Sequence, residues 1–506
     1  MSVIFRRGCV TALAYTVATQ GALADLTAND VWSDWQNYFQ SMGYTITGNE
    51  NSAGGVITVT DMTLSMDLPE DDGQFSMVMP EMILTENGDG TVSVGLPETF
   101  PMTITGAAED EEFQVNITYA QTGLSMIVSG DPDDMTYDYS ADTLGIVLDS
   151  IDGGDEPLPD DVLDVSIDLT DMQGSSRMLI GENRNIAQNF TAAELAYTLQ
   201  FQDPENDESG LFDGSLKQLT FEGENVIPNG FDLSDPQAFY EAGFAFSGNF
   251  TYGSGRTDIS GISDGEQFTM ASSSSGGDFA ASIDAQRVTY DIEQNEPKLA
   301  VTTADLPFPI EIAMATAGLK LEIPIQETET AEPFAFALNL TDFTMSDVLW
   351  SIFDPAGSLP RDPATVALDA TGTAKILMNI FDADDTVAFE ASQEVPAELH
   401  SLQINELLVS LVGARLTGDG DFNFDNENTE EFGMPTPSGV ANLQLVGANT
   451  LIDKLIEMGF LSDSDALGAR MMMGMMAVPG EAPDTLNSTI EFTEDGQILA
   501  NGQRIK

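Results

Sequence analysis

The chain has 506 residues, of which 84 are Asp or Glu and 16 are Lys or Arg, so its formal net charge is -68 at pH 7. A surface this acidic repels nucleic acid, which is bound through Lys and Arg side chains that displace counterions, and it repels anionic membrane surfaces. Hydrophobic residues make up 42% of the chain, which excludes a disordered protein. We interpret the charge as adaptation to a salty medium (a halotolerant protein), with a surface that binds calcium weakly as the alternative.

Residues 1–24 have the pattern of an export signal. Arg6 and Arg7 give a positive start, residues 8–23 carry no charge, and the segment closes on Ala22-Leu23-Ala24. We predict cleavage after Ala24 and release of the mature protein into the periplasm. The apolar stretch is short for a membrane span, and an uncleaved N-terminal anchor is the alternative.

Cys9 is the only cysteine, and it lies inside this signal. Cleavage leaves 14 Lys or Arg against 84 Asp or Glu, a net charge of 14 − 84 = −70. A mature chain without cysteine has no disulfide, no cysteine nucleophile, no thiolate zinc site and no iron–sulfur cluster.

The segment 27–42 predicts one helix. Thr27 and Asp30 form a capping-box pattern, and Trp32, Trp35 and Phe39 recur at helical spacing on one face. Gly43 is placed to end this helix. The spacing predicts an N-terminal helix that packs on a sheet.

From residue 44 to about 340 the apolar residues mostly alternate with polar ones, which predicts strands. A change of phase at Thr60-Asp61 predicts a bulge. A short motif recurs as VTDM at 59–62, LTDM at 169–172 and LTDF at 340–343. We interpret this motif as strand-to-turn chemistry, with an old duplication as the alternative. The alternation favours antiparallel sheets with one wet face. The clearest alternating segments are 56–68, 113–119, 163–169, 216–221 and 334–340.

The predicted fold is mainly β (α+β), with large curved antiparallel sheets or a β-sandwich, an N-terminal helix and a few C-terminal helices. We divide the chain into an N-terminal helix and β region, an acidic linker or loop, a second β region and a mixed C-terminal region. Their bounds are 25–148, 149–161, 162–340 and 341–506, and residues 425–438 are a second loop candidate.

Helices are predicted again at 345–353, 449–460 and 464–477, before a closing hairpin over 485–499. The third helix has methionine on nearly every side, so we expect its Met side chains to be buried. They are Met471, Met472, Met473, Met475 and Met476.

The segment 347–372 reads DVLWSIFDPAGSLPRDPATVALDATG, and the chain ends on DGQILANGQRI. Both resemble the bacterial domain-of-unknown-function family 2125, exported alphaproteobacterial proteins without assigned catalytic residues. More distantly, the strand-rich body is similar to AsmA-like envelope proteins. We expect Arg361, held between two prolines, to serve a structural role by pairing with carboxylates, with ligand binding as the alternative. The structural motif comprises Trp350, Asp354, Pro355, Pro360, Arg361, Asp362 and Pro363.

Sequence motifs for catalysis are missing. His400 is the only histidine, and there is no G-x-S-x-G elbow or phosphate-binding glycine loop. Residues 419–427 alternate acids but have Phe424 where an EF-hand needs glycine, so we interpret them, like Asp382, Asp384 and Asp385, as a solvated face. We therefore expect no catalytic residues, no metal and no cofactor.

The function expected from the sequence is that of a non-enzymatic periplasmic protein, acting as an envelope scaffold or binding an apolar ligand such as lipid. The 28 Phe and 23 Met residues motivate the lipid hypothesis, because methionine suits varied apolar partners. An acidic carboxylate-dependent enzyme and a calcium-binding adhesion or assembly module are the alternatives. Filling of an ordinary β-sandwich core would also explain these residues.

Overall fold

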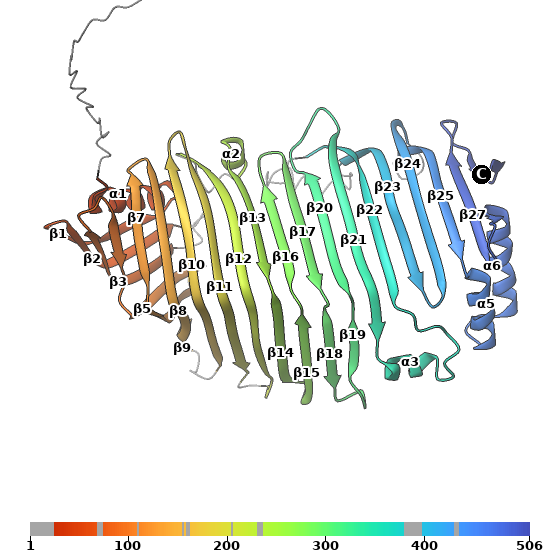
Figure 1. The fold of residues 1–506 in the computed structure, drawn as a ribbon, viewed down its shortest axis with the longest axis horizontal. Helices are drawn as coiled ribbons and strands as arrows, with labels where there is room; N and C mark the ends of the chain where they lie inside the picture. The colour runs from red at the N-terminus through yellow and green to blue at the C-terminus, as the bar shows by residue number, and fades with distance from the viewer. Residues whose placement is uncertain are drawn as a thin grey trace, which may run out of the picture.

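A computed structural model gives the fold and describes residues 25–67, 74–108, 111–153, 156–157, 162–203, 206–229, 236–378, 397–429 and 435–506. The predicted signal at 1–24 and the acidic residues Asp382, Asp384 and Asp385 lie outside these ranges. Within them, 29 strands join one sheet in which every pairing is antiparallel. The predicted class is confirmed, and the architecture is the large sheet rather than the sandwich (Figure 1).

The N-terminal part of the sheet comprises β1 Thr45–Ala53, β2 Val56–Asp67, β3 Gln74–Glu86, β4 Val92–Gly95, β5 Thr99–Ala108, β6 Glu111–Thr122, β7 Ser125–Asp131, β8 Asp134–Gly153 and β9 Glu156–Pro157. The central strands are β10 Leu163–Ile180, β11 Asn183–Gln202, β12 Ser209–Pro228, β13 Ala245–Tyr252, β14 Ser254–Ser263, β15 Glu266–Ser274, β16 Gly277–Ile283, β17 Arg287–Asn295, β18 Lys298–Thr303, β19 Ile310–Ala313 and β20 Thr316–Pro324.

The C-terminal strands are β21 Glu332–Met345, β22 Ala364–Ile376, β23 Ala397–Leu411, β24 Ala414–Thr429, β25 Pro435–Val446, β26 Val478–Pro479, β27 Thr485–Phe492, β28 Ile498–Ala500 and β29 Gln503–Arg504. The helices are α1 Ala28–Ser41, α2 Pro236–Glu241, α3 Asp347–Phe353, α5 Ala448–Glu457 and α6 Asp463–Met476. The closing hairpin is confirmed as β27 and β28.

The N-terminal end of the sheet closes on itself. β3 pairs with both β4 and β5, and the circuit returns through β7, β8 and β6. The principal hydrophobic core lies in this part of the chain, and its buried members come from residues 26–137. Among them are Trp32 of α1 and Val59 and Leu84 of neighbouring strands, with exposed fractions of 2%, 0% and 0%. Closure therefore gives the N-terminal strands the covered core that one open sheet cannot provide.

Helix α1 forms as its sequence predicts. The Thr27 side chain accepts from the backbone N–H of Asp30, and the Asp30 carboxylate accepts from that of Thr27. Gly43 follows with φ of 80°, a conformation that ends a helix without strain on a side chain. The apolar face of the helix then packs on β1, β2 and β3.

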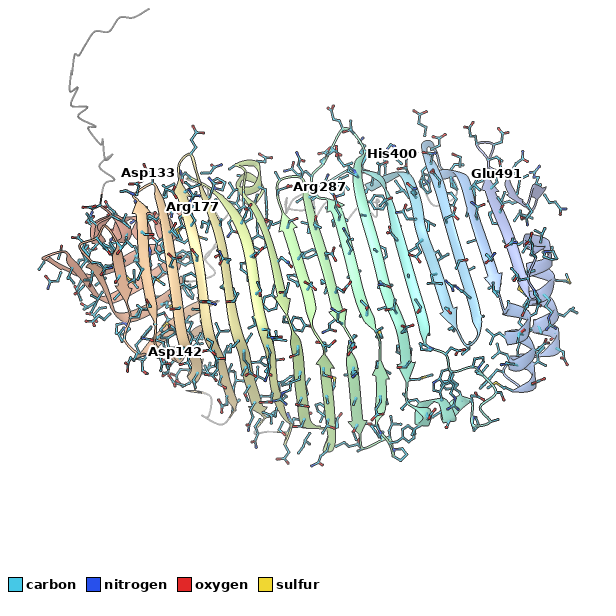
Figure 2. The ribbon with its side chains drawn as sticks, viewed as in Figure 1. Asp133, Asp142, Arg177, Arg287, His400 and Glu491 are labelled. Carbon is cyan, nitrogen blue, oxygen red and sulfur yellow. The ribbon has the colours of Figure 1, made fainter. Side chains whose placement is uncertain are left out.

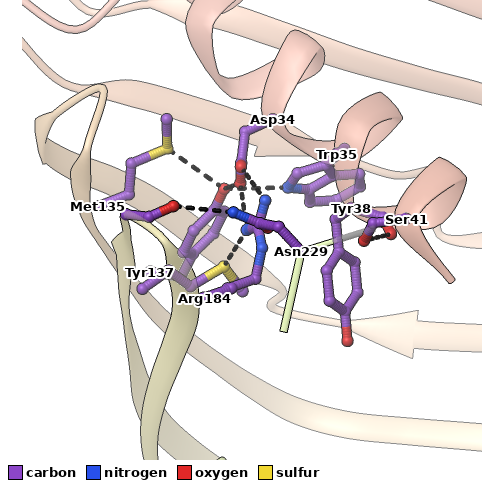
Figure 3. A network of polar contacts seen from close by, with 10 residues as sticks. Asp34, Trp35, Tyr38, Ser41, Met135, Tyr137, Arg184 and Asn229 are labelled. Carbon is purple, nitrogen blue, oxygen red and sulfur yellow. Dashed lines mark hydrogen bonds and ion pairs between the residues drawn. The ribbon is translucent and has the colours of Figure 1, made fainter. Parts of the chain in front are cut away.

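A buried ion pair ties α1 to a strand far along the chain (Figure 3). Arg184 of β11 donates from Nη1 and Nη2 to the two carboxylate oxygens of Asp34, at 3.1 and 2.5 Å. Both side chains are at most 7% exposed. Tyr137 of β8 donates to Asp34 at 3.4 Å, and the Tyr38 ring lies 4.9 Å from the Arg184 guanidinium carbon. Burial raises the pKa of Tyr137, and the negative Asp34 beside it raises the pKa further.

From β10 onward the sheet is a single layer with little core of its own. Among the residues described, the buried members of the principal hydrophobic core end at Tyr137 of β8. The long strands lie side by side in an elongated slab, with α5 and α6 at its far edge (Figure 1). Both faces of this part of the sheet are therefore accessible to solvent.

The recurring VTDM, LTDM and LTDF motifs lie inside long strands, so their interpretation as strand-to-turn chemistry is wrong. Asp61, Asp171 and Asp342 have φ of 53°, 48° and 52°, the left-handed region that Asp tolerates better than most residues. In β2, Val59 and Met62 lie on either side of Asp61, yet both enter the same core. The kink thus absorbs the change of phase and keeps apolar residues on one face, which confirms the irregularity predicted at Thr60-Asp61.

The expected burial of the Met run in α6 is also wrong. Met471, Met472 and Met475 are 62%, 60% and 59% exposed. α6 lies at the end of the sheet, and Arg470 forms an ion pair with Asp453 of α5. The outer side of α6 has no layer above it among the residues described. In the same ranges, none of the helices combines the length and apolarity needed to span a bilayer.

Loss of the Asp34–Arg184 pair should destabilise the N-terminal end. We expect Arg184→Met to cost about 3–5 kcal/mol, because it leaves the Asp34 carboxylate buried without its partner. Urea denaturation of the full chain measures this cost, and Asp34→Leu combined with Arg184→Met should restore much of the loss.

Arg177→Met is the matched control. Arg177 forms an ion pair with Asp134 at 2.7 Å, but the two side chains are 55% and 39% exposed, so its removal should cost less than about 1 kcal/mol. Equal costs for Arg184→Met and Arg177→Met would contradict the assignment of Asp34–Arg184 as the anchor of α1.

Candidate ligand-binding surface

A row of mainly apolar residues crosses the sheet on one face. Residues that pair directly in an antiparallel ladder point to the same side, so the register defines the row. It runs over β11, β12, β13, β16, β17, β20, β21, β22, β23, β24, β25 and β27 as Phe190, Phe221, Phe250, Phe279, Ile292, Leu319, Leu338, Leu368, Leu407, Gly418, Leu443 and Ser488. Eleven strand spacings of about 4.8 Å make the row roughly 50 Å long. We call the face that carries this row the apolar face.

A second row lies beside the first on the same face. It includes Ala281, Tyr290, Leu321 and Phe336, which pair in that order on β16, β17, β20 and β21. A third row toward the other strand ends consists of Val165, Leu199, Phe212, Ile259, Met270, Val301 and Ile310. The apolar face is therefore several residues wide.

The opposite face is polar in the same register. Each member of the first row has a strand neighbour that points to this opposite face. These neighbours form a row of their own, which consists of Asn189, Glu222, Asn249, Ala280, Asp291, Lys320, Ala337, Asp369 and Glu406. Charged side chains also lie near the strand ends, where Figure 2 labels Asp133, Arg287 and Glu491. The sheet is amphipathic across its thickness, and its acidic charge lies mainly on one side and at the ends.

The residues of the apolar face remain accessible. Phe279, Ile292 and Leu319 are 42%, 39% and 41% exposed, and none of the row from Phe190 to Leu443 is buried. Aromatic rings lie over glycines of neighbouring strands. At Gly214, for example, the Tyr197 ring is so close that a Cβ atom added to the glycine would lie 2.3 Å from it. The rings thus cover the backbone closely, and large apolar patches of this kind mark binding surfaces.

Helix α1 covers the apolar face at its first end. Tyr137 pairs with Ser176, Ser176 pairs with Gln188, and Gln188 pairs with Gly223. This line of directly paired residues continues into the second row, so Tyr137 points to the apolar face. The contact of α1 with Tyr137 and Arg184 therefore places this helix on the apolar face. At the far end α5 and α6 follow the last long strands (Figure 1).

A pocket of about 670 Å³ lies where α3 and the loop after it cover the apolar face. Leu340 and Val366, which pair across β21 and β22, form part of its wall with Phe343 from beyond the Asp342 kink. Trp350 and Phe353 of α3 line it from the other side. Its volume lies within the range of sites for small molecules.

The predicted structural motif borders this pocket. Arg361 lies with its guanidinium carbon 5.7 Å from the centre of the Trp350 ring. Its Nη1 donates to Oδ1 of Asp347, and its Nη2 donates to the carbonyl of Asp354 at 3.5 Å. Arg361 thus pairs with one carboxylate of α3 while it lines the pocket together with Asp362.

Asp354 holds the loop that follows α3. Its carboxylate is fully buried and accepts from the backbone N–H groups of Ser358 and Leu359 at 2.8 and 2.9 Å. Burial by itself would raise the pKa of Asp354, but these hydrogen bonds and the positive Arg361 together hold that pKa below its ordinary value. Asp354 is therefore an anchor of the loop that carries Arg361.

Other candidate residues lie apart from this pocket. His400 is in β23, with Nε2 3.8 Å from Glu398. It is ten residues from the pocket residue Ser410, a distance of about 33 Å along a strand. Residues 419–427 lie in β24, and among the described ranges no three His, Cys, Asp or Glu side chains converge as a metal site.

Sequence reasoning missed the partners of the motif. Asp347 and Phe353 lie within the predicted helix, but Leu340, Val366 and Leu411 come from three strands whose neighbours in space depend on register. The LTDF motif was the available signal, because its kink places Phe343 beside Leu340.

Comparison with known protein families places part of the chain in a family. Residues 254–503 match the model of a family described as "Uncharacterized protein conserved in bacteria (DUF2125)". The match confirms the expected resemblance to domain-of-unknown-function family 2125, and it spans β14 to β29, including the α3 pocket. No curated protein and no protein of solved structure gives a match.

The lowered pKa of Asp354 predicts a loss of stability in acid. A carboxylate whose pKa is lower in the folded chain than its ordinary 3.8 contributes stability above about pH 4. This contribution disappears as the pH falls through the lowered pKa of the folded state. We expect Asp354→Asn to lower the melting temperature at about pH 7, with a difference from wild type that shrinks toward about pH 3.

Asp362→Asn, an exposed change in the same loop, is the control and should leave the pH dependence unchanged. A constant difference between Asp354→Asn and wild type across that pH range would contradict the role of the charged Asp354.

Proposed function

We propose that this protein, which carries the conserved uncharacterised bacterial domain over residues 254–503, is exported and binds lipid or another apolar chain along the apolar face. We infer that it acts in the cell envelope as a non-enzymatic carrier or shield, as the expected likeness to AsmA-like proteins also suggests.

The apolar row supports this proposal more than any other feature. Its side chains are organised as a core would be, in register from β11 to β25, yet the described residues supply no layer that buries them. Exposed apolar surface gains roughly 25 cal/mol per Å² when it is covered. A partner that lies along the row would recover this free energy.

The shape of the surface favours a chain-like apolar ligand. The row is long, and aromatic rings of the apolar face lie close to the backbone, as at Gly214 and Tyr197. Acyl chains suit this long apolar surface because they need no hydrogen-bond partners. A protein partner would have to supply a complementary apolar face of similar length. A scaffold that binds such a protein is the alternative outcome of the test.

Absence of catalysis is part of the proposal. Its support is the separation of the one histidine, His400, from the α3 pocket, and the acidic residues spread over the polar face, as at Asp291, Asp369 and Glu406. Turnover of a glycan substrate that is lost on changing one Asp or Glu pair would contradict it.

Lipid extraction from the purified full chain, followed by mass spectrometry, tests the binding proposal. We expect co-purifying lipid and uptake of a fluorescent fatty acyl probe. Phe279→Gln should weaken probe binding roughly tenfold, because it removes an aromatic contact from the centre of the row.

Ala280→Gln is the matched control, since Ala280 is the next residue of β16 and points to the polar face. It should bind the probe as wild type does. If neither protein binds probe and no lipid is extracted, the apolar face is a protein-binding scaffold.

Export is tested by the terminus of the mature protein. We expect a protein that begins at Asp25 in the soluble periplasmic fraction, because Ala22-Leu23-Ala24 is a signal-peptidase pattern. Recovery of an intact Met1 terminus in the membrane fraction, shown by mass spectrometry, would contradict this.

A further inference from the structure

The pocket beneath α3 combines an apolar wall with charge at its rim. Its wall is apolar, with Leu340, Phe343 and Val366 from the sheet and Trp350 and Phe353 from α3. The wall is continuous with the apolar face, because Leu340 pairs with Ala317 and Val366 in the ladder next to the main row. A ligand chain that lies along the sheet can therefore end in this pocket.

The rim carries one positive and two negative groups. Arg361, Asp347 and Asp362 all line the pocket. The Arg361 side chain is 31% exposed and the Asp347 side chain 88% exposed, so both charges remain within reach of a ligand. Asp362 follows Arg361 directly and is exposed as well.

The position of Arg361 is fixed by the fold. Its guanidinium is placed against the Trp350 ring and donates to the carbonyl of Asp354. Asp354 is itself anchored by the backbone of Ser358 and Leu359. A cation held in this way presents its remaining donors to the pocket at little further entropic cost.

We propose that this pocket binds the head group of a zwitterionic amphiphile, with its phosphate on Arg361 and its ammonium group on Asp347 and Asp362. This inference rests on the proposed binding of apolar chains along the sheet, and it names the class of ligand. A phospholipid with an aminoalkyl phosphate head group has the required chemistry.

The charges at the rim select against other head groups. A head group that is only anionic gains Arg361 but faces Asp347 and Asp362, and like charges at close range are unfavourable. A head group that is only cationic is attracted by the two Asp side chains but is repelled by the positive Arg361. A zwitterion replaces the exposed Arg361–Asp347 pair with two pairs of opposite charge, and guanidinium is suited to phosphate oxygens.

The test measures binding of three soluble short-chain lipids to the full chain. They share the same acyl chains and carry a phosphoethanolamine, a phosphoglycerol or an uncharged glycerol head group. We expect the phosphoethanolamine lipid to bind about tenfold more tightly than either of the others, since a charge-assisted contact is lost in each.

Two sets of variants assign the contacts. Arg361→Gln should weaken the phosphoethanolamine lipid about tenfold and leave the uncharged lipid unchanged. Asp347→Asn with Asp362→Asn should weaken the phosphoethanolamine lipid and strengthen the phosphoglycerol lipid, because repulsion of the anionic head group is removed. Arg256→Gln, on the polar face where Arg256 pairs with Asp213 and Asp258, is the control and should change nothing.

The outcomes separate this inference from the proposed function. If all three lipids bind equally and Arg361→Gln has no effect, the head-group site is wrong while binding along the apolar face stands. Tightest binding of the phosphoglycerol lipid would also overturn it in favour of an anionic head group. If the uncharged lipid and the fatty acyl probe both fail to bind, the proposed function itself fails.

A folding defect must be distinguished from loss of a contact. Arg361→Lys keeps the charge and should retain part of the preference for phosphoethanolamine over glycerol. Arg361→Gln should still bind the uncharged lipid as wild type does, which shows an intact pocket. Loss of binding to all three lipids by Arg361→Gln, with wild-type binding by Arg361→Lys, would show that Arg361 supports the loop rather than the head group.

Discussion

The register of one antiparallel ladder determines the character of this protein. Directly paired residues share a face, so a row such as Phe250, Phe279, Ile292 and Leu319 can collect apolar side chains from strands far apart in sequence. The neighbouring row carries Asp291 and Lys320 on the opposite face. Because the described chain supplies no second layer over most of this sheet, the result is an amphipathic surface rather than a core.

Long strands can keep such a face only if changes of phase are absorbed locally. Asp61, Asp171 and Asp342 do this at left-handed kinks in three strands, and Gln218, with φ of 56°, lies in β12 at a similar change of phase. The two ends of the sheet are handled differently. α1 is fixed over the first strands by Asp34 and Arg184, whereas the α3 loop forms a pocket on the face that remains open.

Local patterns in the sequence predicted much of the fold. The capping box at Thr27 and the alternation in 56–68 depend on neighbouring residues, and both are seen in α1 and β2. What covers an apolar side chain is not a local property. The composition of α6 predicts that Met471 is buried, but Met471 is exposed. The pairing of Asp34 with Arg184, 150 residues away, has no signal in either segment.

The same limit applied to the candidate site. Proline-flanked Arg361 could be singled out because arginine is rare in this chain, but its pocket depends on Leu340 and Val366, which meet only through the ladder. Alternation likewise predicted an apolar face without showing that it stays open. That openness is the property on which the proposed lipid binding depends.

Site-specific photocrosslinking in cells tests this account most directly. A photoreactive side chain is placed either at Leu319, on the apolar row, or at Lys320, the next residue on the polar face. The account predicts crosslinks to lipid from position 319 and none from position 320. Equal lipid crosslinking from the two positions, or crosslinks from position 319 to protein alone, would contradict it.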